Sequence, residues 1–229
     1  MLGPTFSALT GLNNASKRLQ NSANNLANVQ TAGFKKGEVT SVQSKSGGTR
    51  VNSVAKVNTQ GGLIPTNNPL DLAIEGNGFF QVTNPNGGVS FTRSGSFSLN
   101  GAGQVVDSSG NSLIPNINVP AGNNGISIGA NGQISTQTAG GLEGAGQVQL
   151  ANFNNPAGLS AAGGNLLNES AASGAPVVGN PNQGPFGSVL SGFLEGSNVD
   201  IAEEMVDQIV AKAAFKANVN VIKANDEMI

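Results

Sequence analysis

The chain has 229 residues, of which 38% are hydrophobic and only 10% are charged, and its formal net charge is −2 at pH 7. It contains no His, Cys, Trp or Tyr, which excludes a serine–histidine–aspartate triad, a cysteine nucleophile, a disulfide and the usual zinc sites. The slight negative charge argues against nucleic-acid binding, and no apolar run is long enough for insertion into a membrane as a helix. We therefore expect no metal, no cofactor and no catalytic residue.

Residues 1–35 are predicted to form an N-terminal helix. Their apolar residues recur every three or four positions, which is the spacing of an amphipathic helix, and Gly33 is a suitable stop. The other face is rich in Asn, Ser and Gln rather than in charged residues. Four leucines define the heptad-like stripe: Leu9, Leu12, Leu19 and Leu26.

The segment 36–66 is polar, has scattered valines with little periodicity, and is predicted to be an extended connector. A β-rich middle domain is expected over residues 67–186, because short apolar runs alternate there with Asn-Gly pairs, a strong hairpin signal. Those pairs begin at Asn77, Asn86, Asn100, Asn124 and Asn131. The expected strands are 79–82, 89–92, 96–99, 104–106, 126–128, 133–136 and 147–153. The stretch 154–185 is expected to be mostly loop.

The C-terminal segment 187–229 carries the second predicted helix, which starts near Asp200. Asp200 followed by Glu203 has the spacing of a capping box, and acidic residues in a first turn suit the helix dipole. The expected apolar face of this helix consists of Ile201, Met205, Ile209, Phe215, Val219 and Ile222. The sequence as a whole predicts an α+β fold in which the two terminal helices pair as a coiled-coil-like layer and the middle is all β.

Charge also separates along the chain. Residues 1–36 contain Lys and Arg but no acid, whereas residues 195–229 contain seven acids and three lysines. The two ends are therefore expected to attract each other, within one chain or between chains. Periodicity alone leaves two alternatives open: the apolar stripes pack only within the chain, as in an ordinary α+β domain, or they also contact other copies.

Short motifs of enzymes occur, but their chemistry is incomplete. Residues 125–129 match the Gly-x-Ser-x-Gly nucleophile elbow, which needs a histidine that the chain lacks. Residues 53–56 match Ser-x-x-Lys but lie in the predicted connector. Asp71 and Glu75 are close in sequence, yet a carboxylate pair for sugar hydrolysis has no further support. A cell-wall hydrolase and a surface adhesin remain the weaker alternatives to a structural protein.

Three blocks of sequence resemble the signatures of bacterial flagellar rod and hook proteins. They span 22–36, 69–82 and 194–200, in the order found in that family, and residues 155–159 and 164–166 favour its rod members. Gln30 stands where the family usually has Asn, and the stretch between Phe34 and Gln60 is short. The signature residues are Asn24, Asn25, Leu26, Asn28, Gly33, Phe34, Asp71, Gly76, Gly78, Phe79, Phe80, Ser197, Asn198, Val199 and Asp200.

The resemblance implies a structural subunit of the flagellar basal-body rod, with the extracellular hook as the alternative. Family members polymerise helically around an export channel and transmit motor torque. The implied partners are other copies of the chain, other rod and hook proteins, and the flagellar type III export apparatus, which such proteins enter without a cleaved signal peptide. The ten apolar residues of the two stripes would then be subunit-packing residues, and no nucleic acid or membrane insertion is implied.

Overall fold

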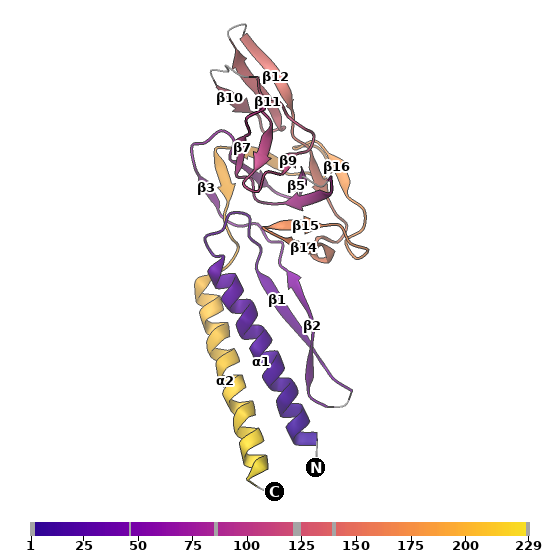
Figure 1. The fold of residues 1–229 in the computed structure, drawn as a ribbon, viewed down its shortest axis with the longest axis vertical. Coiled ribbons are helices and arrows are strands. Elements are labelled where there is room, and N and C mark those ends of the chain that lie inside the picture. The colour runs from indigo at the N-terminus through magenta and orange to yellow at the C-terminus, as the bar shows by residue number, and fades with distance from the viewer. Residues whose placement is uncertain (1–2, 46, 85–86, 121–124, 139–140, 228–229) are drawn as a thin grey trace. The chain divides into compact units, whose positions relative to one another are not determined.

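The computed structural model describes residues 3–45, 47–84, 87–120, 125–138 and 141–227 (Figure 1). Asn86 and Asn124, which begin two of the expected Asn-Gly turns, lie outside these residues. The chain divides into two compact units. The first consists of Met1–Gln30, Lys35–Asn58 and Asn198–Ile229, and the second of Thr31–Phe34 and Thr59–Ser197.

The first unit contains two long helices, α1 (Gly3–Ala27) and α2 (Ile201–Asp226). They lie side by side and run in opposite directions, so both chain ends of this unit lie at the same end of the helix pair (Figure 1). Helix α1 ends before Gly33, the expected stop. The prediction of terminal helices around a β-rich middle is confirmed.

A β-hairpin packs beside α1 in the same unit, where an extended connector was expected. It consists of β1 (Gly37–Gln43) and β2 (Thr49–Lys56), paired antiparallel. The pairing register shifts between Thr40 and Ser41, so a β-bulge interrupts the alternation of side chains. The extra residue of the bulge is Asn52 of β2, which the register skips. Because the valines of each strand are three residues apart rather than two, the usual strand signal was hidden in the sequence.

The second unit is built almost entirely from short antiparallel strands. Its largest sheet contains β5 (Phe79–Thr83), β6 (Val89–Thr92), β7 (Phe97–Leu99), β8 (Val105–Asp107), β9 (Ser112–Leu113), β13 (Leu150–Asn152), β14 (Ser160–Gly163), β15 (Leu166–Asn168) and β16 (Val177–Gly179). A three-stranded sheet contains β10 (Ile126–Ile128), β11 (Gln133–Thr138) and β12 (Gly141–Gln147). Two pairs complete it: β4 (Leu72–Glu75) with β17 (Ser188–Ser191), and β3 (Leu63–Pro65) with β18 (Phe193–Glu195).

The core of the second unit is made by aliphatic side chains and phenylalanines from these strands. Phe80 and Phe97 meet edge to face with their ring centroids 5.3 Å apart, and Leu72, Ile74 and Leu150 surround them. A smaller cluster forms around Phe91 and Phe153. Edge-to-face contact is the favourable arrangement for aromatic rings because their edges and faces carry opposite partial charges.

Two stretches of this unit differ from the sequence-based prediction. Residues 154–185, expected to be mostly loop, contain a short 3-10 helix (Pro156–Gly158) and the strands β14, β15 and β16. Residues 187–199, grouped with the C-terminal helix, contain β17 and β18. Both differences have the same physical cause, since strands of three or four residues are too short to show a clear alternation of apolar and polar side chains.

Candidate functional site

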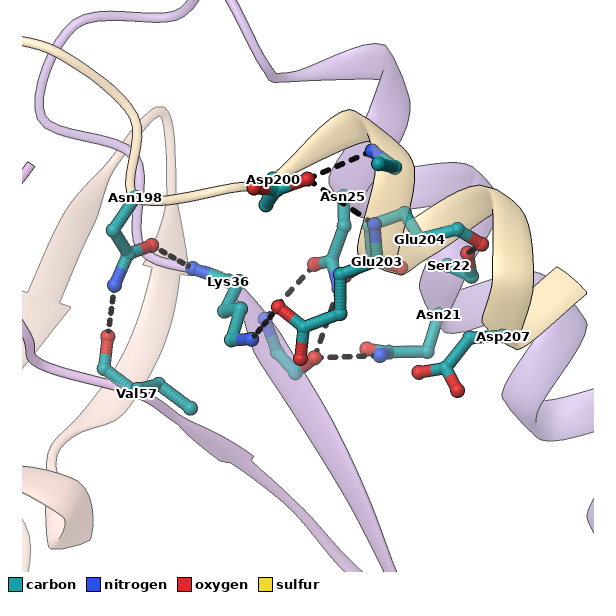
Figure 2. Close-up of polar contacts among 12 residues, drawn as sticks. Asn21, Ser22, Asn25, Lys36, Val57, Asn198, Asp200, Glu203, Glu204 and Asp207 are labelled. Carbon is teal, nitrogen blue, oxygen red and sulfur yellow. Dashed lines mark hydrogen bonds and ion pairs between the residues drawn. The ribbon is translucent and has the colours of Figure 1, made fainter.

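Asn25 is the centre of a polar network in the first unit, where the end of α1, the start of β1 and the start of α2 meet (Figure 2). Its side-chain nitrogen donates to the Gly37 carbonyl at 2.9 Å and to Glu204 Oε1 at 2.8 Å. Its side-chain oxygen accepts from the Gly37 backbone N–H at 2.9 Å. Asn21 donates a second hydrogen bond to the Gly37 carbonyl. One asparagine of α1 thus bonds to groups of two other elements, β1 and α2.

Glu204 extends this network across the two helices. It is 4% exposed, and its backbone carbonyl accepts a hydrogen bond from the Ser22 hydroxyl at 3.0 Å. Burial of a carboxylate is unfavourable unless hydrogen bonds compensate for lost water, and Asn25 provides such a bond. This requirement sets the position of α2 along α1.

Two ion pairs flank the buried network. Lys36 Nζ lies 2.8 Å from Glu203 Oε2, and Arg18 Nη2 lies 3.3 Å from Asp207 Oδ1. The hydrogen bond to Glu203 raises the pKa of Lys36 above its usual 10.5, although partial burial acts in the opposite direction. Both pairs are partly exposed, so each contributes modestly to stability.

Asn198 and Asp200 organise the entry into α2 (Figure 2). The Asn198 side chain accepts from the Lys36 backbone N–H at 2.7 Å and donates to the Val57 carbonyl at 2.8 Å, which ties the two ends of the hairpin together. The Asp200 carboxylate accepts from the backbone N–H groups of Ala202 and Glu203 and caps the helix. The expected cap is thereby confirmed, whereas the Glu203 carboxylate, which a capping box directs to the backbone, pairs with Lys36.

Beside this network, Asn21, Ser22 and Glu204 border a cleft of about 400 Å³ between α1, α2 and β1. Its lining is polar and carries two cations and four carboxylates. The charged lining residues are Arg18, Lys36, Glu38, Glu203, Glu204 and Asp207. The cleft therefore has an excess of negative charge. Among the described residues, no group of three His, Cys, Asp or Glu side chains is arranged to hold a metal ion.

Small residues occupy most of the fully buried positions of the helix pair, whereas three of the four leucines of the α1 stripe are half-buried. Ala8, Ala15 and Ser22 are buried on α1 at intervals of seven residues, and Ala211 is buried on α2. A Cβ added at Gly11 would lie 2.7 Å from the Asn218 side chain. Small side chains at these positions permit close approach of the two backbones.

The ten residues expected to pack between subunits are therefore not buried in a single copy. Five are exposed and five are half-buried. The exposed residues are Leu9, Ile201, Met205, Ile209 and Phe215. The half-buried residues are Leu12, Leu19, Leu26, Val219 and Ile222. The largest exposed fraction, 67%, is that of Ile209.

Comparisons with known proteins match the chain to flagellar rod and hook proteins. Residues 73–136 match the family model described as flagellar hook protein FlgE/F/G D1 domain, and residues 190–229 match that of the flagellar basal body rod FlgEFG protein C-terminal. The chain is 36% identical to the flagellar basal-body rod protein FlgG of Agrobacterium fabrum, with 96% of this chain and 94% of that relative covered. It is 34% identical to FlgG of Borreliella burgdorferi, with 100% and 97% covered. The chain belongs to the FlgG family of flagellar basal-body rod proteins.

A hook protein is also similar, but over a shorter part of the chain. The flagellar hook protein FlgE of Escherichia coli is 39% identical over 84 residues, which cover 37% of this chain and 21% of that protein. The FlgG family therefore confirms the rod interpretation and makes the hook alternative weaker. Membership in a family of rod and hook proteins also confirms the expectation that the chain is not an enzyme.

Within this FlgG-family chain, the signature residues of the first unit cap, bridge or flank the helices. Asn25, Asn198 and Asp200 form the network described above, and Val199 beside them is buried. The Asn28 side chain donates to the Asn24 carbonyl at 2.9 Å, one residue beyond the end of α1. The Asn24 side chain is exposed and Leu26 is half-buried. The signature blocks of the sequence identified these residues, but the sequence did not reveal their hydrogen-bond partners.

In the second unit the signature residues serve the packing of strands. Phe79 and Phe80 are core residues of β5, and Phe34 is buried. Gly33 has a φ of 69°, and a Cβ there would collide with the backbone of Ser94. The remaining members also lie at turns or strand ends: Asp71, Gly76, Gly78 and Ser197.

Sequence reasoning missed a buried ion pair in the second unit. Arg93 Nη1 lies 3.3 Å from Glu195 Oε2, and Arg93 Nη2 donates to the Gly76 carbonyl at 2.8 Å. Glu195 Oε1 accepts from the Gly61 N–H at 3.0 Å. Desolvation lowers the pKa of Arg93, an effect that Glu195 opposes. The only available signal was that Arg93 is the single Lys or Arg between Lys56 and Lys212.

None of the helices in the described part of the chain combines the length and the apolar character needed to cross a membrane.

Proposed function

We propose that the chain is a structural subunit of the flagellar basal-body rod that polymerises helically around an export channel and transmits motor torque. Full-length similarity to proteins named FlgG supports the rod. The observation that supports polymerisation is the apolar face of α2, which is exposed to solvent in a single copy. Exposed apolar surface of this extent is typical of a protein interaction site.

The paired helices of the first unit would form the inner layer of the polymer. Their seam supports a coiled-coil-like arrangement, since Ala8, Ala15 and Ser22 are spaced by seven residues and Glu204 and Ala211 are likewise seven apart. Heterologous contacts, in which one surface meets a different surface of the next copy, build open helical assemblies rather than closed dimers. The ten subunit-packing residues then supply the apolar contacts to neighbouring copies.

The proposed partners are further copies of the chain, other rod and hook proteins and the type III export apparatus. Entry into that apparatus as an unfolded chain without a cleaved signal peptide is consistent with the absence of cysteine and the low charge content. The proposed domain organisation keeps an N-terminal axial helix, a β-rich middle domain and a C-terminal axial helix, with the β1–β2 hairpin in place of an extended connector.

Deletion of the gene followed by electron cryotomography of the motors in place tests this function. Truncated rods without a hook are the expected result, and restoration by the wild-type gene shows that the loss is specific. Rods of full length that lack a hook would instead assign the chain to the hook. Intact flagella in the deletion strain would contradict both assignments and reopen the adhesin and hydrolase alternatives.

An Ile209→Asp variant tests the apolar face itself. Because Ile209 is exposed in the single copy, the charge is expected to block rod assembly while leaving the fold of the isolated chain unchanged. Val177→Asp, at an exposed position of the second unit, is the matched control and is expected to swim. Normal swimming of the Ile209→Asp strain would contradict a buried subunit contact at this face.

A further inference from the structure

Three lysines form a basic strip on α2. Lys212, Lys216 and Lys223 are exposed and are separated by four and seven residues. At about 100° per residue these intervals place all three within a sector of about 40° on the helix surface. In the described part of the chain no carboxylate lies within 4.0 Å of any of them. Like charges at this spacing destabilise a helix slightly, so the strip does not stabilise the fold of a single copy.

Two acidic residues of α2, Glu203 and Asp207, lie on the flank opposite the lysines. Glu203 and Lys212 are nine residues apart, and so are Asp207 and Lys216, which corresponds to about 180° around the helix. Glu203 and Asp207 border the cleft described above, where carboxylates outnumber cations. The side of α2 between the two flanks carries the buried residues Glu204 and Ala211. One unit thus has a basic flank and an acidic flank on opposite sides of the same helix.

We infer that the basic strip of one copy docks against the acidic cleft of the next copy, with Lys212 and Lys216 facing Glu38, Glu203 and Asp207 across the subunit interface. This inference rests on the proposed function, because it specifies which face meets which in the polymer. Opposite charges on opposite flanks suit a heterologous contact, in which each copy offers a different surface to each neighbour. The same arrangement does not suit a two-fold dimer, which would bring identical surfaces together.

The surroundings of the strip agree with an interface between proteins. Met205 and Ile209 lie on the same flank as the lysines, one or two turns earlier, and are exposed by 54% and 67%. An apolar core bordered by a polar rim is the usual composition of such an interface. A polyanion is a poorer occupant, since three lysines on a chain of net negative charge supply little counterion release.

Disulfide cross-linking tests the contact directly, because the chain contains no cysteine. A Lys216→Cys/Glu38→Cys variant is expected to form ladders of linked copies in oxidised, purified basal bodies. Each single variant, Lys216→Cys or Glu38→Cys, is the control and is expected to stay monomeric on the gel. The pair Lys17→Cys/Arg50→Cys, at exposed positions outside the strip and the cleft, controls for chance encounters. Rods that contain the double variant without any ladder overturn the inference.

Charge reversal provides an independent test in the deletion strain. Lys212→Glu/Lys216→Glu is expected to lower the number of assembled rods about tenfold, as repulsion replaces several modest ion pairs. Adding Glu38→Lys to this variant is expected to restore part of the assembly. Lys17→Glu/Lys45→Glu changes the net charge equally outside the strip and is expected to assemble normally. Normal assembly of the reversed variant, or loss that Glu38→Lys does not relieve, overturns the inference and favours a different partner. Failure of the wild-type gene to restore rods in the deletion strain would contradict the proposed function itself, not only the docking of the strip.

Discussion

Asn25 donates its side-chain N–H to the buried carboxylate of Glu204 over 2.8 Å, although the two residues lie 179 positions apart in the chain. The exposed fractions of the two residues are 1% and 4%. A hydrogen bond to a charged group in such surroundings is stronger than one in water, and its loss leaves a buried polar atom unsatisfied. This contact therefore fixes which turn of α1 lies beside the first turn of α2.

An Asn25→Ala variant should loosen the network around Glu204 and Gly37. The substitution removes three hydrogen bonds and leaves Glu204 without this donor, so we expect a loss of about 1–3 kcal/mol in the free energy of unfolding. Hydrogen exchange monitored by mass spectrometry should show faster exchange in residues 37–43 and 201–208.

Asn24→Ala is the matched control because the Asn24 side chain is exposed one position earlier on the same helix. It should leave the exchange rates of both segments unchanged. Equal effects of the two substitutions would contradict a specific role for the Asn25 network.

Ala15→Leu should separate the two helices. Ala15 is buried to 4% exposure on the small-residue seam, and three added heavy atoms have no space there without displacement of α2. Overpacking of this kind costs about 1–3 kcal/mol. Thermal unfolding followed by circular dichroism measures the effect. Ala23→Leu makes the same change at an exposed position of α1, and a similar fall in Tm for both variants would refute a close contact at the seam.

The terminal helices and the β-rich middle were predictable because each has a strong local signal. Helical spacing of apolar residues marked both ends of the chain, and Asp200 marked the start of α2. Asn-Gly pairs separated the strands of the middle domain. The signature blocks added the positions of Asn25, Asn198 and Asp200, which form the polar network between the helices and the hairpin.

The hairpin and the helix seam were not predictable in the same way. A bulge at Asn52 interrupts the alternation of β2, and the valines of both strands are spaced by three residues, so the hairpin was indistinguishable from a polar connector. The leucine stripe was the strongest apolar pattern on α1, yet the fully buried apolar residues of this helix are Ala8 and Ala15. Close approach of two backbones depends on the partner surface, which no local pattern of a single segment reports.

The pairing of Lys36 with Glu203 should make stability sensitive to alkaline pH. The pKa of Lys36 is raised above 10.5 in the folded chain, chiefly by this hydrogen bond. The stabilising contribution is therefore complete below pH 10.5 and is lost as the pH rises through the folded-state pKa. We expect the stability difference between the wild type and Lys36→Met to shrink over this alkaline range. Because the pair is partly exposed, the difference at neutral pH should be below about 1 kcal/mol. A difference that stays constant with pH would show that the ammonium group is not responsible.

The buried pair of Arg93 and Glu195 should be the most sensitive point of the second unit. Glu195→Gln keeps the shape of the side chain and the acceptor for the Gly61 N–H, but it leaves the Arg93 charge uncompensated beside Phe79, 5.2 Å from the ring centroid. Breaking a buried ion pair in this way costs about 3–5 kcal/mol. Denaturant titration of the purified chain measures the loss, and Glu143→Gln at an exposed position of β12 should change little. Arg93→Met/Glu195→Gln removes both charges and should be more stable than Glu195→Gln alone. A double variant that is less stable than the single one would mean that the bond from Arg93 to the Gly76 carbonyl, rather than charge compensation, dominates this site.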